Sequence, residues 1–184
     1  MISHENALKL LHQNIQSVQM IKHSLASEAV MRSIALKLNE NEEEWGLAGL
    51  LHDIDVELTH ADPLTHGPYA AGMLEGLLSV EAIDAIVMHN EMATGKERFT
   101  VFQHALAAAE TITGLIMATA MVYPDRKLAS VKTKSITKRM KEKAFAASVK
   151  RENILECELI GIPIEDFAEL SLLAMQQISD ELGF

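Results

Sequence analysis

The stretch LAGLLHDIDVELTH, residues 47–60, decides how the chain folds and raises the question of its function. No side chain in the segment 45–51 is charged, and its two glycines allow close packing, so this segment predicts a helix buried on every side. That helix runs directly into His52 and Asp53. Burying these two polar groups costs several kcal/mol unless a partner or a metal ion satisfies them.

The composition favours an all-α protein. Hydrophobic residues make up 48% of the 184 positions, proline occurs only 4 times, and helix formers are abundant. This length suits one domain, so we expect residues 1–184 to form a single helical bundle, with a core at about 20–122 and additional C-terminal helices within 124–184. A single cysteine, Cys157, excludes an internal disulfide, and no leader opens the chain, so we expect a cytoplasmic protein.

Caps and hydrophobic periods predict the individual helices. The predicted ranges are about 3–18, 20–38, 41–52, 68–78, 79–89 and 101–122. Apolar residues at 136, 140, 144 and 147 predict a further helix through the basic segment, and Gly161 and Pro163 separate two more helices. Residues 54–64 and 92–100 are expected to be loops.

The run ALAAAETITGLIMATAMV, residues 105–122, has the length of a membrane-spanning helix and a single charge, Glu110. Half of its residues are Ala and Thr, and a carboxylate in lipid costs a few kcal/mol. We therefore interpret the run as a buried core helix. Glu110 then joins His52 and Asp53 as a buried group that needs a partner.

Four histidines and two carboxylates form a set of potential metal ligands. His23 lies on the apolar stripe of its predicted helix, His89 follows apolar residues at helical spacing, and His66 stands at a helix start. Each histidine alone also suits a hydrogen-bonded core or cap position. Together they add up to six inward or helix-end groups: His23, His52, Asp53, His66, His89 and Glu110.

This donor set suits divalent Mn, Fe, Co, Ni or Zn better than calcium, which prefers oxygen alone. Six protein ligands are too many for one catalytic metal ion. Two ions that share a bridging carboxylate would each keep an open position for water and substrate, as hydrolysis requires. The buried helix of the opening stretch would thus deliver a metal-binding pair, His52 and Asp53.

The order His, His-Asp, His-Gly, His and acid resembles the HD superfamily of metal-dependent phosphohydrolases, more closely its small HDIG-type members. The resemblance runs from His23 through AAAETITGLI and into KSITKRMKEKAFAASVKRE. It implies an α-helical domain with one metal ion held by the first histidine, the His-Asp pair and the last acid. In dinuclear branches the two intervening histidines hold a second ion. In this sequence the ligands of the first ion would be His23, His52, Asp53 and Glu110, and the histidines of the second ion would be His66 and His89.

Two positions depart from the pattern of that superfamily. The last ligand is usually Asp in an AAD-like sequence, and here it is Glu110. The glycine of HDIG is replaced by Asp55, and we expect Asp55 and Glu57 to be solvated loop acids. The HGP sequence at 66–68, with a histidine about twenty residues later, is similar to the branch that hydrolyses symmetrical dinucleoside tetraphosphates. That similarity does not fix the substrate.

The resemblance and the donor set together predict a phosphohydrolase that cleaves a small phosphate ester, with a nucleotide as the favoured substrate, by metal-activated water. His52 and Asp53 are the predicted catalytic residues. A second hypothesis is a regulatory or nucleotide-binding module that keeps the fold and a metal ion without turnover, in which Glu110 marks the change. A purely structural helical protein is the third hypothesis, and it has to explain six inward polar groups that would bind no metal ion.

Charge is distributed unevenly along the chain. The net charge is −10, which argues against partners such as nucleic acid or an anionic membrane, yet residues 126–151 hold ten basic side chains and one acid. In this segment Lys134, Lys138 and Lys141 recur at helical spacing, next to Arg139. A solvated helix face is one interpretation. The alternative, which we predict, is that the segment folds over the metal site and contacts substrate phosphate through these four residues. The sequence does not indicate an oligomeric state.

Overall fold

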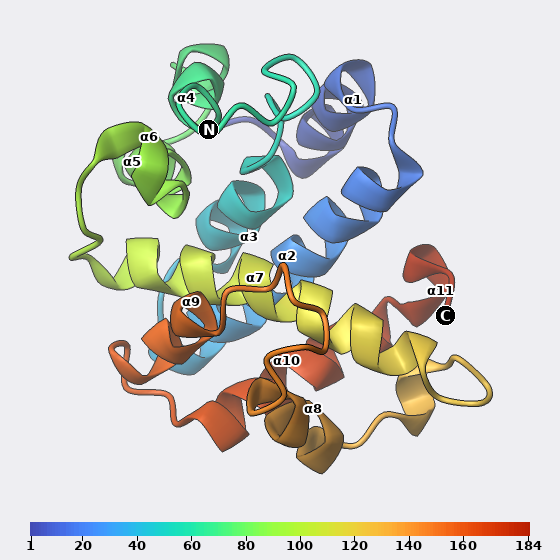
Figure 1. Cartoon of the computed structure of the whole chain (residues 1–184). Coiled ribbons are helices and arrows are strands. Elements are labelled where there is room, and N and C mark those ends of the chain that lie inside the picture. Colours follow the sequence, from blue (N-terminus) through green and yellow to red (C-terminus); the bar gives the residue numbers. More distant parts are fainter.

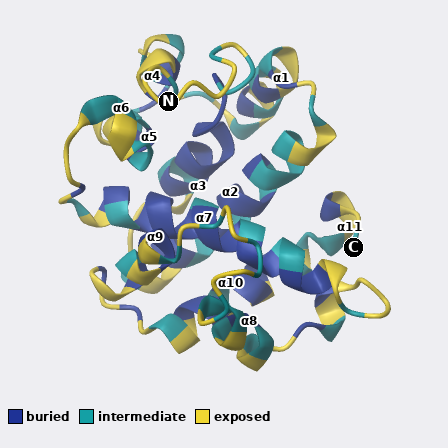
Figure 2. Cartoon of the chain, in the orientation of Figure 1, coloured by how far each residue is buried: buried dark blue, intermediate teal, exposed yellow.

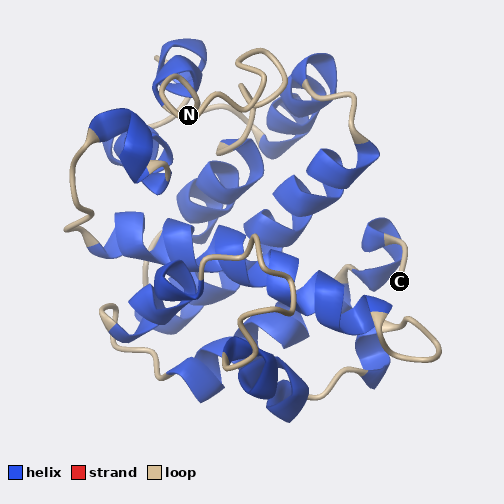
Figure 3. Ribbon diagram, viewed as in Figure 1, coloured by secondary structure: helices blue, strands red, loops and turns tan.

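The protein is built from helices alone, as the computed structural model of residues 1–184 shows (Figures 1 and 3). The predicted all-α class is therefore confirmed. The helices are α1 (His4–Asn14), α2 (Val18–Leu38), α3 (Glu42–Leu51), α4 (Pro68–Leu74), α5 (Val80–His89), α6 (Glu91–Thr94), α7 (Val101–Met121), η1 (Leu128–Ser130), α8 (Thr133–Met140), α9 (Arg151–Leu155), η2 (Glu156–Glu158), α10 (Ile164–Gln177) and α11 (Ser179–Leu182).

Helix α3 is the buried helix predicted from the opening stretch. Asn41 caps its first turn by accepting a hydrogen bond from the backbone N–H of Glu44, and all residues of the segment 45–51 are buried. A Cβ atom placed on Gly49 would lie 2.7 Å from the carbonyl oxygen of Ser27 on α2. Glycine therefore permits the close backbone approach of α2 and α3 that brings the end of α3 to the face of α2.

Helix α7 crosses the middle of the molecule and packs against α2, α5, α9 and α10 (Figure 1). Thr100 and Gln103 form a capping box at its first turn. By length and apolar composition this helix meets the criterion for a membrane span, but 61% of its most apolar window is buried within the protein. In Figure 2 much of its ribbon has the colour of buried residues. The prediction of a buried core helix over this run is confirmed.

The basic segment differs from the prediction, because α8 ends at Met140 and residues 141–150 form turns. The helix predicted to continue to Ala147 is wrong. Arg151 explains the difference, since its guanidinium donates hydrogen bonds to backbone carbonyl oxygens that a continuous helix would pair internally. The acceptors are the carbonyl oxygens of Arg139, Glu142, Phe145, Ala146 and Val149.

The turns between residues 141 and 150 carry the chain across α7 (Figure 1). A Cβ atom placed on Gly114 of α7 would lie 3.4 Å from the Cγ2 atom of Val149, so the two segments are in contact there. The helices that follow, α9 and α10, pack against α7 and α2. One continuous cluster of buried side chains extends from Ala7 to Leu182 and includes these C-terminal helices.

Candidate metal centre

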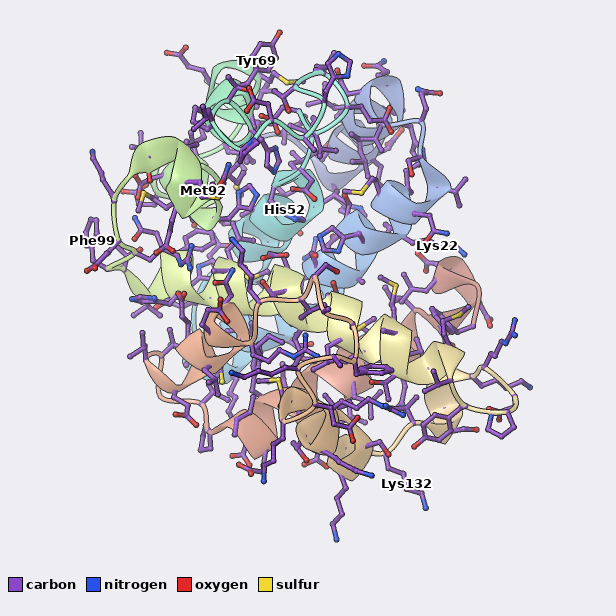
Figure 4. All side chains as sticks on the ribbon, in the orientation of Figure 1. Lys22, His52, Tyr69, Met92, Phe99 and Lys132 are labelled. Carbon is purple, nitrogen blue, oxygen red and sulfur yellow. The ribbon has the colours of Figure 1, made fainter.

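The structure brings the six predicted ligands together from segments far apart in sequence, close to His52 near the centre of Figure 4. Their positions follow from the ends and inner faces of the helices. His23 lies on α2, His52 and Asp53 follow the last turn of α3, His66 precedes α4, His89 ends α5, and Glu110 lies on α7.

The first group of ligands consists of His23, His52 and Asp53. The Nε2 atoms of the two histidines are 3.1 Å apart. The Oδ2 atom of Asp53 lies 3.5 Å from Nε2 of His23 and 3.3 Å from Nε2 of His52. These three donor atoms lie close enough to one another to hold a metal ion.

A second group shares Asp53 with the first. The Oδ1 atom of that carboxylate lies 3.1 Å from Nε2 of His66 and 3.4 Å from Nε2 of His89. The two histidine nitrogens are 3.1 Å apart, and the three donors again meet the spacing of a metal site. Asp53 therefore presents one oxygen to each group.

Each of the four histidines uses its Nδ1 atom for a hydrogen bond and directs Nε2 inward. The Nδ1 partners are the carbonyl oxygens of Gly49 and Ile86 for His52 and His89, the Asp55 carboxylate for His66, and the Thr113 hydroxyl for His23. Because carbonyl and carboxylate oxygens can only accept, Nδ1 carries the proton in three of these rings. Thr113 donates its own hydroxyl to the carbonyl oxygen of Glu110, so it accepts from His23 in the same way.

This arrangement fits bound cations. Neutral rings of this tautomer leave four Nε2 lone pairs facing one another and the Asp53 carboxylate, which is unfavourable without positive charge between them. Without a metal ion, protonated rings can supply this charge. Burial raises the pKa of Asp53, but the charge of protonated His52 and hydrogen bonds from Nε2 of the histidines outweigh burial and hold this pKa well below its usual range. The Asp53 carboxylate is therefore ionised and available to a metal ion.

Asp55 corrects a sequence prediction, because it is a fully buried residue and not a solvated loop acid. Its Oδ1 accepts from Nδ1 of His66 at 2.7 Å, and its Oδ2 accepts from the backbone N–H groups of Gly67 and Ala70 at 2.8 and 3.1 Å. Burial raises the pKa of Asp55, but these hydrogen bonds outweigh it and lower the pKa overall. Asp55 thus orients a predicted ligand and caps α4.

His66 lies between the two aspartates. Burial lowers its pKa, but hydrogen bonds to Asp53 and Asp55 raise it to about 10. Without a metal ion, a proton on Nε2 of His66 supplies positive charge beside Asp53. A metal ion at this position has to displace that proton, so its binding to the second group should release a proton.

Glu57 is a partly exposed acid in the loop after α3, and it also makes specific contacts. Its carboxylate accepts hydrogen bonds from the backbone N–H groups of Gln16 and Ser17, directly before α2. These contacts fix the start of the helix that carries His23. They connect the loop after α3 to the beginning of α2.

Glu110 lies at the edge of the first group. Its Oε2 atom is 3.9 Å from Nε2 of His23, and its Oε1 accepts a hydrogen bond from the hydroxyl of Thr111. It is not part of the compact donor group formed by His23, His52 and Asp53. Its distance from His23 nevertheless places the Glu110 carboxylate beside this group.

A cavity of about 290 Å³ opens beside the histidines. Most of the residues that line it are polar, and Lys150 is its one lysine or arginine. The lining consists of His23, His66, His89, Asn90, Glu110, Thr111, Gly114, Ser148, Val149, Lys150 and Asn153. The cavity therefore combines predicted metal ligands with one cation and several hydrogen-bonding groups.

The basic segment reaches this cavity, but through residues 148–150 and not through the predicted side chains. Lys134, Lys138 and Lys141 line a separate cavity of about 500 Å³, and Arg139 packs over the ring of Phe145. In Figure 4, Lys132, directly before α8, lies at the rim of the molecule, well away from His52. The four predicted side chains do not line the cavity beside the histidines, and their contact with substrate phosphate stays a prediction.

Sequence reasoning did not assign three residues to the site: Asp55, Lys150 and Asn153. Asp55 stands two positions after Asp53 and could have been found from its place in the buried HDID stretch. Lys150 and Asn153 gave no signal, because the turns that bring them to α7 depend on contacts made by Arg151.

Residues 20–139 match the family model of the HD domain. The match covers more than half of the 184 residues, includes all six predicted ligands and ends before residues 148–153 of the cavity. The chain has no match among curated proteins or among solved structures. Members of this family are generally metal-dependent hydrolases, which agrees with the convergence of histidines on Asp53. The sequence match and the helical fold together establish that the chain belongs to the HD-domain family.

Proposed function

We propose that the protein is a metal-dependent phosphohydrolase with two divalent ions bound on either side of Asp53. The observation that carries this proposal is the Asp53 carboxylate, whose two oxygens face two separate pairs of histidines. A shared carboxylate leaves room at each ion for water and substrate. The cavity of about 290 Å³ lies at the lower end of the range for ligand pockets, which favours a small phosphate ester. A nucleotide remains the substrate class that we propose.

The proposed roles follow the two donor groups. Bound ions of the Mn, Fe, Co, Ni or Zn type would supply Lewis-acid activation of water and neutralise phosphate charge. Asp53 would bridge the ions, and the hydrogen bonds to Nδ1 of each histidine would keep Nε2 directed inward. The proposed first set is His23, His52, Asp53 and Glu110, and the second set is Asp53, His66 and His89.

Lys150 is the residue that we propose for contact with substrate phosphate. It lines the cavity together with four of the proposed ligands, on the turn segment that crosses α7. The net charge of −10 repels an anionic substrate, so a single cation inside the cavity is favourable for binding. This proposal replaces the four basic residues that the sequence favoured.

Replacing Lys150 with Met should raise KM for the substrate about tenfold, because a hydrogen bond to a charged group is lost while the metal ligands stay in place. Metal content and thermal stability should stay at the wild-type level. Steady-state kinetics at low salt, where charge attraction is strongest, measure the effect.

Lys143→Met is the matched control, because Lys143 is an exposed lysine on the same turns and lines neither cavity. It should leave KM unchanged. If Lys138→Met raised KM more than Lys150→Met did, the phosphate contact would belong to α8, as the sequence suggested.

A regulatory HD-fold module without turnover is the second candidate function. One observation favours it: Glu110 lies outside the compact donor group, and one of its oxygens is already engaged by Thr111. A first ion held by only three protein ligands would bind more weakly. The module would then bind a nucleotide without hydrolysing it.

The test of the proposed function combines elemental analysis of the purified protein with a screen of nucleotides and simple phosphate esters under several divalent ions. Two metal ions per chain and hydrolysis of a screened compound, detected as inorganic phosphate or as a nucleotide product, are expected. Nucleotide binding without hydrolysis under every ion would favour the regulatory module. Absence of bound metal after incubation with each ion would contradict both functions.

We propose the cytoplasm as the location and a phosphorylated small molecule as the ligand. The buried, unpaired thiol of Cys157 suits a reducing compartment. Burial and the charge of Glu158 raise the pKa of this thiol to about 12, so it is a structural side chain and not a nucleophile.

A further inference from the structure

Arg98 is a buried arginine in the loop between α6 and α7, with only 2% of its side chain exposed. All five N–H donors of its guanidinium have acceptors in the protein. The acceptors are the two carboxylate oxygens of Glu156, the carbonyl oxygens of Met88 and His89, and the Oδ1 atom of Asn153. A guanidinium satisfied in this way is fixed in one orientation.

One set of these hydrogen bonds, called here the arm to His89, leads to the second donor group. Arg98 donates from one nitrogen to the carbonyl oxygens of Met88 and His89, at 3.0 and 3.2 Å. These carbonyls end α5, where no later turn of the helix can pair with them. Because His89 is the last residue of α5, fixing its backbone fixes the origin of a side chain whose Nε2 faces Asp53.

The other arm reaches the first donor group. Asn153 accepts from Arg98 at 3.3 Å and donates through Nδ2 to the Thr111 hydroxyl at 3.4 Å. That hydroxyl donates in turn to Oε1 of Glu110. Glu110 therefore stands at the end of a chain of hydrogen bonds that begins at Arg98.

We propose that Arg98 is a positioning residue that orients His89 and Glu110 together, and so couples the two metal sites. Its partners Asn153 and Glu156 lie outside the residues that match the HD domain, so helix α9 and η2 complete the centre from the C-terminal part of the chain. The inference rests on the proposed function, because it assigns His89 and Glu110 as metal ligands.

Stability alone does not explain this buried ion pair. Removing two charges from water costs several kcal/mol per ion, and apolar residues of similar volume often stabilise a protein equally well. The pair also constrains more than one element, because Oε2 of Glu156 accepts from Nδ1 of His104 on α7 at 2.7 Å. The geometry fits a device that fixes the relative positions of α5, α7 and α9 around the cavity.

The experiment measures Mn²⁺ affinity by calorimetry in wild type, four single variants and one double variant, so it does not depend on turnover. Arg98→Lys keeps the charge but cannot reach all five acceptors, and it should weaken both ions about 10- to 100-fold, the usual effect of losing a partner that orients a ligand. Asn153→Ala leaves the arm to His89 intact and should weaken one ion by about tenfold or more.

Arg32→Lys is the matched control, because Arg32 also forms ion pairs with carboxylates, those of Glu28 and Glu43, but contacts none of the proposed ligands. It should lower Tm without changing Mn²⁺ affinity. A double variant, Asn153→Ala with Glu110→Gln, should bind the weakened ion no worse than Glu110→Gln alone, since both changes act through Glu110.

Two outcomes would overturn the inference in different ways. If wild type bound two Mn²⁺ ions and Arg98→Lys bound them equally well with a lower Tm, Arg98 would be structural and the proposed function would stand. If wild type bound no Mn²⁺, the proposed function would fail, and the positioning role would fail with it.

Discussion

Asp53→Ala should bind neither metal ion, and its kcat should fall below about one thousandth of the wild-type value. Asp53 is the only carboxylate that faces both histidine pairs, with its oxygens 3.1 to 3.5 Å from four Nε2 atoms. Its removal leaves four imidazoles without an anionic partner. A bound metal ion supplies several kcal/mol of transition-state stabilisation, and its loss accounts for the expected decrease in rate.

Elemental analysis and phosphate-release assays measure these two losses. Asp166→Ala serves as the control, because Asp166 is an exposed acid on α10. It should retain both ions and full activity. Wild-type phosphate release by metal-free Asp53→Ala would contradict the metal-dependent mechanism as a whole.

The helices and the proposed ligands were predictable from the sequence because both depend on local patterns. Helical periods put His23 and His89 on inward faces, and the uncharged segment before His52 required a buried helix. The side chains then meet because the ends of α3 and α5 approach the inner faces of α2 and α7. Their mutual distances, by contrast, required the packing of α2 against α3 and α7.

The features that the sequence did not predict depend on contacts between distant residues. A lysine stripe on α8 has the same helical spacing whether it faces a substrate or solvent, and only the packing of α8 decides this. Arg98 lies in a segment with the composition of an exposed loop, yet its partner Glu156 is 58 positions away. The sequence alone predicts a solvated acid at Asp55, because its acceptor role depends on the fold of residues 66–70.

The pH dependence of stability should reflect Asp55. Its pKa is lowered in the folded protein, so its ionised form stabilises the fold above the ordinary value of about 3.9, and this contribution is lost as the pH falls through the folded pKa. Asn at this position does not titrate. With a metal chelator present, the difference in Tm between wild type and Asp55→Asn should therefore be largest near neutral pH and shrink toward pH 3. Thermal melts at several pH values measure this difference.

Asp55→Asn should also weaken binding of the second metal ion about 10- to 100-fold while the protein stays folded. Two backbone N–H groups, of Gly67 and Ala70, donate to Oδ2 of Asp55, so the amide oxygen of the variant has to take that position. The amide NH₂ group then faces Nδ1 of His66. Because two donors repel, the ring has to move its proton to Nε2, and the lone pair that a metal ion needs is lost.

Asp55→Ala serves as a comparison that distinguishes the change of the His66 tautomer from a loss of stability. It leaves the backbone N–H groups of Gly67 and Ala70 and the Nδ1 atom of His66 without their acceptor, and should lower the free energy of unfolding by about 3 kcal/mol. Calorimetric titration of Mn²⁺ should detect one ion of near wild-type affinity and one weak ion in Asp55→Asn. Two ions of wild-type affinity would mean that His66 keeps its tautomer without Asp55. Since the Nδ1 atom of His66 has no other hydrogen-bond partner in the protein, we expect weak binding of the second metal ion in Asp55→Asn.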